Sequence, residues 1–412
     1  MPEAGIRDVD IETRVWVTTA DGRVAIRPGT PMLVWPVRAR PNYLRHSMRI
    51  HFSESDELHT RPLDMRRNHK ESESMNYQAN TWALVLAAGD GTRLASLTTD
   101  QDGRAVPKQF CSLNGGDSLL QASLRRARQI VPRRRICTIV ARSHEHYWRR
   151  TLRSFPEANV IVQPRNRGTA NGLLLGVLRI LEHDPLARIV FLPADHHVLD
   201  ERSLISSIRA AAALVRRDPR STLRERLLLV GISPEGPDPG LGYIVQGASL
   251  GAGIRRVTQF VEKPTAAVAR ALIARGAVWN SFILAAHGTA VVASIRERYP
   301  HTVDDMIKAL RLDATHGTCA LEGLYEVLPE VDFSRSIAQG AESALCVYTA
   351  PACGWTDLGT PGRVGAALHR LWISQRRRPL LGTSHAPAFV NLATQYGRLD
   401  GATAETGSLV IP

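Results

Sequence analysis

Apolar runs of strand length alternate with amphipathic stretches of helix length between about Trp82 and Ile232. The strand candidates are rich in aliphatic and β-branched residues and occupy residues 82–88, 135–141, 159–164, 188–195 and 226–232. The helix candidates between them occupy residues 118–131, 144–153, 169–184 and 203–217. Parallel strands need a long crossover connection, and right-handed crossovers place helices on both faces of the sheet. We therefore predict an α/β protein with a Rossmann-like, doubly wound, mostly parallel sheet.

The pattern changes after Gly231, where the β segments become shorter. "GYIVQG", "RRVTQFVEKP" and "NSFILAA" are strand-like, and the stretch "AAVARALIARG" between the last two is helical. We expect this part to form a mixed-sheet region that completes the substrate side of the same domain. Because ligands in open α/β folds bind beyond the carboxyl ends of the strands, polar residues at strand ends are the first candidates for a site.

The two ends of the chain lack the periodic pattern of its middle. Residues 51–74, "HFSESDELHTRPLDMRRNHKESES", are too polar and irregular to contribute a core face. We expect residues 1–80 to be a poorly ordered extension, 81–371 to be the globular domain, and 372–412 to be a C-terminal tail. Met75 lies shortly before the first strand and is an alternative start of the protein.

Composition narrows the class of protein further. The 412 residues are 44% hydrophobic and 22% charged, which is ordinary for a globular chain, and the formal net charge is +13. The arginines are scattered through helices and no nucleic-acid-reading module is visible, so an anionic substrate or an arginine-rich genome explains the charge better than a nucleic-acid partner. The 5 cysteines include no C-x-x-C pair and are expected to be reduced thiols.

Nothing in the sequence indicates a membrane partner. It contains no stretch of about 18 apolar residues, and its first residues are acidic and polar, unlike a signal peptide. We therefore expect a soluble, cytoplasmic protein. A homodimer is compatible with the sequence.

A glycine-rich loop follows the first strand, with Gly89 and Gly91 on either side of Asp90. Glycine tolerates positive φ and leaves room for backbone N–H groups to turn toward an anion. The loop is neither a Walker A motif nor a dinucleotide fingerprint, and taken alone a plain tight turn explains it equally well. Arg93 closes the loop and Lys108 follows in "VPKQF". Two cations converging on one glycine loop suit a triphosphate, whereas a surface salt bridge is the alternative for each alone.

These residues resemble the signature of the sugar-1-phosphate nucleotidyltransferases, and specifically the mannose-1-phosphate guanylyltransferase branch. The resemblance begins with "LAAGDGTRL" and "PKQF" and continues in order through "QPRNRGTA", "FLPADHHV", "GYI", "FVEKP", "WNSF" and "GWTDLG". It covers roughly residues 82–365 and implies the nucleotide-diphospho-sugar transferase type of fold. By the resemblance, Arg93 and Lys108 are catalytic. The implied nucleotide-binding residues are Leu86, Ala87, Ala88, Gly89, Gly91, Thr92, Arg165, Gly168, Thr169 and Ala170.

The resemblance also implies a Mg²⁺ site. Asp195 comes just past a buried strand, where a carboxylate is solvated or binds a cation, and a helix N-cap is the alternative. Asp357 in "GWTDLG" is the second implied ligand, with a capping role in a turn as its alternative. His196 and His197 are assigned supporting roles, because Mg²⁺ prefers hard oxygen ligands.

The sugar-phosphate side is implied to consist of Gly242, Tyr243, Glu262, Lys263 and Asn280. A carboxylate accepts hydrogen bonds from sugar hydroxyls while an ammonium meets the phosphate, so the adjacent charges in "FVEKP" are expected to diverge; an exposed ion pair is the alternative. Asn280 suits vicinal hydroxyls, and Trp279 is expected to form an apolar wall.

Three positions depart from the family pattern. Ala88 replaces a frequent glycine, Asn171 stands where proline is common, and Phe282 stands where many relatives have glycine. The phosphate loop is expected to survive if φ at Ala88 is negative. The change at Asn171 leaves the choice of base open, and Phe282 is expected to alter the shape of the sugar pocket.

The resemblance implies transfer of a nucleotidyl group from GTP to a hexose 1-phosphate, first of all mannose 1-phosphate, giving a GDP-sugar and pyrophosphate with Mg²⁺ as cofactor. A sister enzyme that uses another base or sugar is the nearest alternative. A catalytically silent paralogue that binds nucleotide sugars is a second, and the missing third glycine disfavours a dinucleotide-dependent oxidoreductase.

Overall fold

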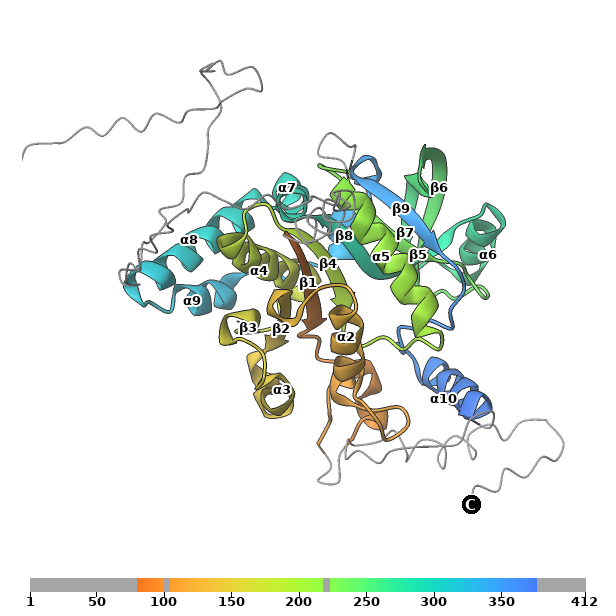
Figure 1. Cartoon of the computed structure of the whole chain (residues 1–412), viewed down its shortest axis with the longest axis horizontal. Helices are drawn as coiled ribbons and strands as arrows, with labels where there is room; N and C mark the ends of the chain where they lie inside the picture. The colour runs from red at the N-terminus through yellow and green to blue at the C-terminus, as the bar shows by residue number, and fades with distance from the viewer. Residues whose placement is uncertain (1–79, 100–103, 218–222, 376–412) are drawn as a thin grey trace, which may run out of the picture. The chain divides into compact units, whose positions relative to one another are not determined.

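The computed structural model describes residues 80–99, 104–217 and 223–375, and these residues form one mixed sheet of nine strands with helices on both faces (Figure 1). The predicted extension before residue 80, including Met75, lies outside the described residues. So does the predicted tail beyond residue 375. The last described helix, α10 (Pro361–Gln375), runs into the first residues of that predicted tail.

Four parallel strands make up one half of the sheet. They are ordered β3-β2-β1-β4, with β1 (Thr81–Ala87) in contact with β2 (Ile136–Ala141) and β4 (Arg188–Pro193), and β3 (Val160–Gln163) at the edge. Nearly every residue of β1, β2 and β4 is buried, as expected for parallel strands covered by helices on both faces. The predicted parallel α/β region is confirmed here.

The other half of the sheet is mixed, and β8 (Val278–His287) joins it to the parallel half. This strand runs antiparallel to β4, to β5 (Leu227–Ile232) and to β6 (Gly242–Gly251). The remaining strands are β7 (Ile254–Glu262) and β9 (Leu345–Ala350), and β9 pairs with both β5 and β7. The predicted mixed region is confirmed, but β9 was not predicted from the sequence.

The helices contribute to two hydrophobic cores. The first core receives apolar residues from α2 (Leu119–Arg128), α3 (Glu145–Leu152), α5 (Glu201–Arg217), α6 (Ala266–Ala274) and α10. The second receives them from α4 (Gly168–His183), α7 (Gly288–Arg298), α8 (Pro300–His316) and α9 (Ala320–Val327). The loops at the carboxyl ends of β1, β3 and β4 stay uncovered by these helices, which leaves room there for a ligand.

Local sequence explains where the best-defined helix begins. Ser118 Oγ accepts a hydrogen bond from the Gln121 backbone N–H, and the Gln121 side chain accepts one from the Ser118 N–H. This capping box satisfies two backbone donors that the first turn leaves without partners. It fixes the start of α2, and therefore the direction in which the chain leaves the Lys108 segment.

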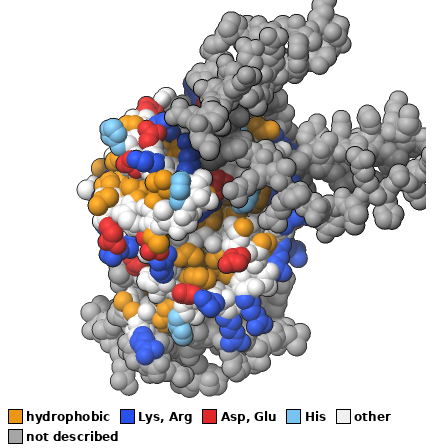
Figure 2. Space-filling view, turned by 90° about the vertical axis from the view of Figure 1, so that its left-hand side faces the viewer, with side chains coloured by type: hydrophobic (Ala, Val, Ile, Leu, Met, Phe, Trp, Pro, Cys, Tyr) orange, Lys and Arg blue, Asp and Glu red, His pale blue; other side chains and the backbone are white. Residues whose placement is uncertain are grey.

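Acidic and basic side chains are interspersed over the face shown in Figure 2. Ion pairs also join different segments of the described chain, for example Arg142 with Glu322 at 2.5 Å and Arg165 with Glu326 at 2.7 Å. Among the residues that the structure describes, no helix is both long and apolar enough to cross a membrane.

The close packing of α4 on β1 depends on Gly176. A Cβ at this position would lie 2.5 Å from Leu84 Cδ2, and Leu84 is fully buried. We predict that Gly176→Ala lowers the free energy of unfolding by about 1–2 kcal/mol, because overpacking outweighs the gain in helix propensity of roughly 1 kcal/mol. Urea unfolding measures the change.

Gly323 in α9 provides the control, because a Cβ there meets nothing within 4 Å. Gly323→Ala should stabilise the protein by up to about 1 kcal/mol. Equal effects of the two substitutions would contradict the packing explanation.

Candidate active site

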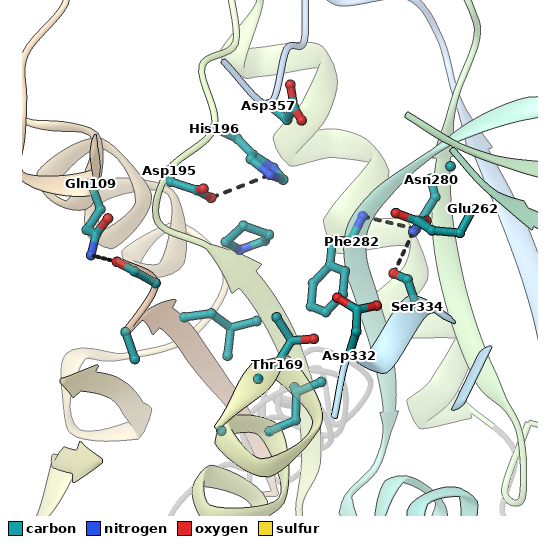
Figure 3. Close-up of a pocket in the computed structure, with 18 of the residues that line it drawn as sticks. Gln109, Thr169, Asp195, His196, Glu262, Asn280, Phe282, Asp332, Ser334 and Asp357 are labelled. Atoms are coloured by element: carbon teal, nitrogen blue, oxygen red, sulfur yellow. Dashed lines mark hydrogen bonds and ion pairs between the residues drawn. The ribbon is translucent and has the colours of Figure 1, made fainter. Parts of the chain in front are cut away.

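A cavity of about 360 Å³ opens at the carboxyl ends of β1, β3 and β4 and extends along β6, β7 and β8 (Figure 3). Its walls come from the loop after β1, the start of α4, the segment after β4, and two later segments around residues 330–334 and 355–357. Residues far apart in the sequence therefore share one cavity, at the position that α/β topology favours for ligands.

The glycine loop forms one end of this cavity. Gln109 is buried, and its Nε2 donates to the backbone oxygens of Ala87 at 3.1 Å and Gly89 at 2.8 Å. Gly91 has φ +64°, and a Cβ there would lie 3.0 Å from the Lys108 N atom, so both conformation and space favour glycine. Ala88 is not among the residues with positive φ, so its backbone has the conformation expected for a phosphate-binding loop with alanine at this position. The Gln109 side chain thus fixes the backbone of the loop between Ala87 and Gly89.

The Arg93 prediction falls partly outside the described residues. The backbone of Thr92 and Arg93 opens a 3₁₀ helix, η1 (Thr92–Leu97), directly after Gly91. The side chains of Thr92 and Arg93 are not among those that the structure describes. Their predicted contacts with a nucleotide stay predictions.

A chain of hydrogen bonds ties the glycine loop to the start of α4. Asn166 Nδ2 donates to Asp90 Oδ2 at 2.7 Å, and Asn166 Oδ1 accepts from the Gly168 N–H at 3.0 Å. Gly168 has φ +82°, and a Cβ there would lie 2.3 Å from the Val331 oxygen. Thr169 Oγ1 accepts from the Phe333 N–H at 2.7 Å. These contacts fix three loops around one end of the cavity.

Not every residue predicted for the nucleotide side lines the cavity. Leu86, Ala88, Gly89, Gly168 and Thr169 do. Ala87 and Ala170 are buried in packing positions, and Gly91 caps η1. Arg165 is exposed and pairs with Glu326, so the structure does not place its side chain at the cavity.

Lys108 is the residue that joins the distant acidic segments. Its Nζ lies 2.9 Å from Asp195 Oδ2 and donates to the Asp357 backbone oxygen at 2.5 Å. The ammonium is almost fully buried, with 9% of the side chain exposed, whereas 37% of the Asp195 side chain is exposed. Asp195 is therefore held by Lys108 on one side and open to the cavity on the other.

A short backbone pairing brings residues 195 and 357 together. His197 and Thr356 exchange two backbone hydrogen bonds, each 2.9 Å long, in an isolated antiparallel bridge. Asp195 and Asp357 each lie within two positions of this bridge, so the pairing holds their backbones close together. The sequence alone contains no periodic signal for such an isolated pairing.

Asp195 is ionised in this environment. Burial raises the pKa of Asp195, but the charge of the Lys108 ammonium and its hydrogen bond to the carboxylate lower it more, so the net shift is downward. Burial lowers the pKa of His196, so this ring is neutral. Trp355 Nε1 donates to His196 Nδ1 at 3.3 Å, which leaves the ring proton on Nε2, 3.5 Å from Asp195 Oδ1. His196 thus orients the carboxylate, in keeping with its predicted supporting role.

The Asp357 carboxylate has a different partner. Its Oδ1 lies 2.9 Å from Arg363 Nε and accepts from the Gly359 N–H at 2.9 Å. Arg363 Nη1 also donates to Asp238 Oδ2 at 2.7 Å. The capping role considered for Asp357 is therefore present. Among the described residues, no group of three or more His, Cys, Asp or Glu side chains is placed to hold a metal ion.

The opposite end of the cavity is rich in hydrogen-bonding groups. Gly242, Glu262, Lys263 and Asn280 all line it. Burial raises the pKa of Glu262 despite the nearby Lys263, whose Nζ lies 3.6 Å from Glu262 Oε1. The two charges were expected to diverge, and instead their head groups approach each other. Lys263 follows the end of β7 and has a left-handed backbone, with φ +50°.

Two aromatic side chains predicted for this end do not line the cavity. Tyr243 is fully buried, and its hydroxyl donates to the Asp238 backbone oxygen at 3.0 Å, so it does not line the cavity. Trp279 also lies outside this cavity and lines a neighbouring one of about 260 Å³. Side chains alternate along a strand, so the neighbours Gly242 and Asn280 face the site while these two rings face away.

Sequence reasoning missed several residues that line the cavity. Ser334 begins the short π-helix η6 (Ser334–Ala338), and Asp332 lies just before it. Ser334 Oγ accepts a hydrogen bond from Asn280 Nδ2 at 3.3 Å. No motif in the sequence marked them. Gln109 was detectable, because it stands next to Lys108 in the quoted "PKQF".

With this geometry established, comparison with known proteins identifies the family. The family model described as "Nucleotidyl transferase" matches residues 82–368. The chain therefore belongs to the nucleotidyl transferase family. This confirms the predicted relationship to the sugar-1-phosphate nucleotidyltransferases.

The curated relatives are distant. The chain is 29% identical over 294 residues to the xanthan biosynthesis protein XanB of Xanthomonas campestris pv. campestris (strain B100), covering 67% of this chain and 57% of that one. It is 27% identical over 295 residues to a mannose-1-phosphate guanylyltransferase of Escherichia coli (strain K12), covering 69% and 59%. The matched part thus spans less than two thirds of these relatives.

One solved structure is similar in fold and in sequence. It is described as a mannose-1-phosphate geranyltransferase from Thermus thermophilus, with a TM-score of 0.58 and 30% sequence identity. The match covers 68% of this chain and 76% of that one. This similarity confirms the predicted fold class.

Burial of His197 has a consequence for pH dependence. Burial lowers the pKa of His197 to about 4 from 6.5, so the folded protein keeps this ring neutral over a range in which the unfolded chain binds a proton. Stability should therefore fall as the pH drops from about 6.5 to about 4, by up to about 1.4 kcal/mol per pH unit from this group. We predict a shallower slope for His197→Leu, measured by urea unfolding across this range. Identical slopes would exclude His197 as a contributor.

Proposed function

We propose that this protein transfers the nucleotidyl group of GTP to a hexose 1-phosphate, with mannose 1-phosphate as the preferred acceptor, giving a GDP-sugar and pyrophosphate. The supporting observation is that one cavity is lined at one end by Asp195, which is paired with the buried ammonium of Lys108, and at its other end by Glu262 and Asn280. Cationic and acidic groups at one end suit a metal-bound triphosphate, and oxygen and amide groups at the other suit sugar hydroxyls. The names of the relatives favour guanylyl transfer to mannose 1-phosphate.

The reaction proposed is a direct in-line displacement. A phosphate oxygen of the sugar 1-phosphate attacks the α-phosphorus of GTP and forms a new P–O bond. The bond from the α-phosphorus to the oxygen that bridges to the β-phosphorus breaks, and pyrophosphate leaves with the electron pair. No side chain forms a covalent intermediate, so the protein contributes position and charge. Lys108 and Arg93 neutralise the pyrophosphate as it leaves, and Gly89 leaves space for the phosphates to approach the backbone.

The acidic residues Asp195 and Asp357 are the reason for proposing a divalent cation. A triphosphate that enters beside Asp195 and Asp357 meets like charges, which a bare nucleotide would not tolerate. Asp195 is ionised, partly exposed and a hard oxygen donor, which fits Mg²⁺. Asp357 is the second proposed ligand and would share its carboxylate with Arg363. Mg²⁺ bound there supplies charge neutralisation on the phosphates.

Substrate choice is tested by a screen. Purified protein with Mg²⁺ is incubated with GTP, UTP or dTTP and with mannose 1-phosphate or glucose 1-phosphate, and pyrophosphate release is measured. The proposal predicts the highest kcat/KM for GTP with mannose 1-phosphate. Preference for another pair would indicate a sister activity, and tight GDP-sugar binding without any pyrophosphate would indicate a silent paralogue.

We predict that Lys108→Ala lowers kcat at least about a hundredfold, because a preorganised charge at the reacting phosphates contributes roughly 3–4 kcal/mol to transition-state stabilisation. Circular dichroism and thermal unfolding check that the variant is folded. Lys308→Ala, on the exposed side of α8, is the control and should keep normal turnover. Near-normal turnover of Lys108→Ala would overturn the assigned role.

The metal assignment gives a separate prediction. Asp195→Asn removes the ionised carboxylate while keeping its size, so the Mg²⁺ dependence of pyrophosphate release should be lost together with activity. Titration with Mg²⁺ at fixed GTP measures this dependence. Asp305→Asn, an exposed residue of α8, should leave the titration unchanged. An unaltered Mg²⁺ titration in Asp195→Asn would count against the site.

A further inference from the structure

Strained backbone gathers around the cavity. Among the described residues, Ala252, Lys263, Phe282 and Leu358 are the non-glycine residues with positive φ. Ala252 lies between β6 and β7 in a turn, whereas Lys263 and Phe282 line the cavity and Leu358 follows Asp357. Aromatic residues rarely adopt φ near +57°, the value at Phe282, because the conformation favours glycine. Such strain persists only where the surrounding structure holds it, and it is concentrated at functional sites.

A bulge in β8 produces the conformation of Phe282. The register of β8 against β5 shifts between the pairs Leu229–Leu284 and Gly231–Asn280, so β8 carries extra residues opposite Val230. Bulges of this kind redirect a side chain out of the normal alternation of a strand. Here the redirected side chain is that of Phe282, which lines the cavity from the centre of the bulge.

The polar side chains next to Phe282 form hydrogen bonds with the backbone of the bulge. Ser281 Oγ donates to the Val230 oxygen at 2.5 Å and accepts from the Ile283 N–H at 3.1 Å. Asn280 Oδ1 accepts from the Phe282 N–H at 3.1 Å. These bonds fix the backbone on both sides of Phe282.

The ring itself lies between the two ends of the cavity. In Figure 3, Phe282 stands between Thr169 on the nucleotide side and Asn280 on the other side, with Asp332 next to it. Phe333 packs against it in an edge-to-face arrangement, with centroids 5.9 Å apart and planes at 76°. The ring therefore has a fixed apolar surface beside groups that bond hydroxyls.

We propose that Phe282 is a specificity-determining residue for the acceptor sugar, and that its ring fills the space beside Asn280 and thereby restricts the acceptor to unsubstituted hexose 1-phosphates. This proposal rests on the proposed function. In this proposal, the N-acetyl group of a substituted sugar projects toward the volume that the ring occupies. The same ring offers an apolar surface to the carbon-bound hydrogens of a pyranose whose hydroxyls face Glu262 and Asn280.

The test compares Phe282→Gly, which removes the ring and suits the left-handed backbone, with Phe282→Leu, which keeps an apolar side chain of similar reach. For each protein, kcat/KM is measured with mannose 1-phosphate and with N-acetylglucosamine 1-phosphate at saturating GTP, and KM for GTP is measured separately. Thermal unfolding monitors the fold of each variant. The wild-type assay comes first, because absence of turnover with any sugar 1-phosphate would refute the proposed function itself.

We expect Phe282→Gly to reduce the ratio of kcat/KM for the hexose over the N-acetylated sugar at least tenfold, with KM for GTP within twofold of wild type. Phe282→Leu should retain most of the selectivity. An unchanged sugar ratio in an active, folded Phe282→Gly protein would overturn the proposal. So would a change in nucleotide preference or in KM for GTP as large as the change for the sugar, because the ring would then serve the nucleotide.

Discussion

The contact of one buried ammonium with two remote segments is the constraint on which this site depends. Lys108 binds the carboxylate of Asp195 and the backbone oxygen of Asp357, and thereby joins the ends of three separate parts of the chain. A buried ammonium is costly unless it is paired, so this arrangement is stable only when all three parts are in place. The backbone pairing of His197 with Thr356 also holds the Asp195 and Asp357 segments together. Any displacement of Lys108 would leave Asp195 without its counter-ion.

The distribution of charge along the cavity follows from this arrangement. Acidic residues are present at both ends, but their environments differ. Lys108 lowers the pKa of Asp195, whereas burial raises the pKa of Glu262. An ionised carboxylate suits a cation that accompanies phosphates, and a carboxyl group with a raised pKa suits hydrogen bonding to neutral hydroxyls. The same chemical group therefore has two different environments within one cavity.

The sequence predicted the parts of the structure that depend on local pattern. The strands β1 to β5 and the helices between them follow from apolar runs and their spacing, and Gly91 and Gly168 adopt positive φ as glycine-rich loops do. Long-range pairing explains what was missed. Strand β9 pairs with β5 and β7, and Arg165 forms an ion pair with Glu326. Local sequence pattern identifies none of these partners. Strand alternation turns the Tyr243 side chain away from the cavity that Gly242 lines. The bulge at Phe282 depends on the Asn280 and Ser281 side chains, which form hydrogen bonds with its backbone.

A crystal structure of the protein with GTP and Mg²⁺ tests the central claim most directly. The account predicts the triphosphate in the described cavity, with Lys108 Nζ within hydrogen-bond distance of a phosphate oxygen and the Asp195 carboxylate on the metal ion. A nucleotide bound elsewhere on the molecule, or one whose phosphates lie away from Lys108 and Asp195, would contradict it.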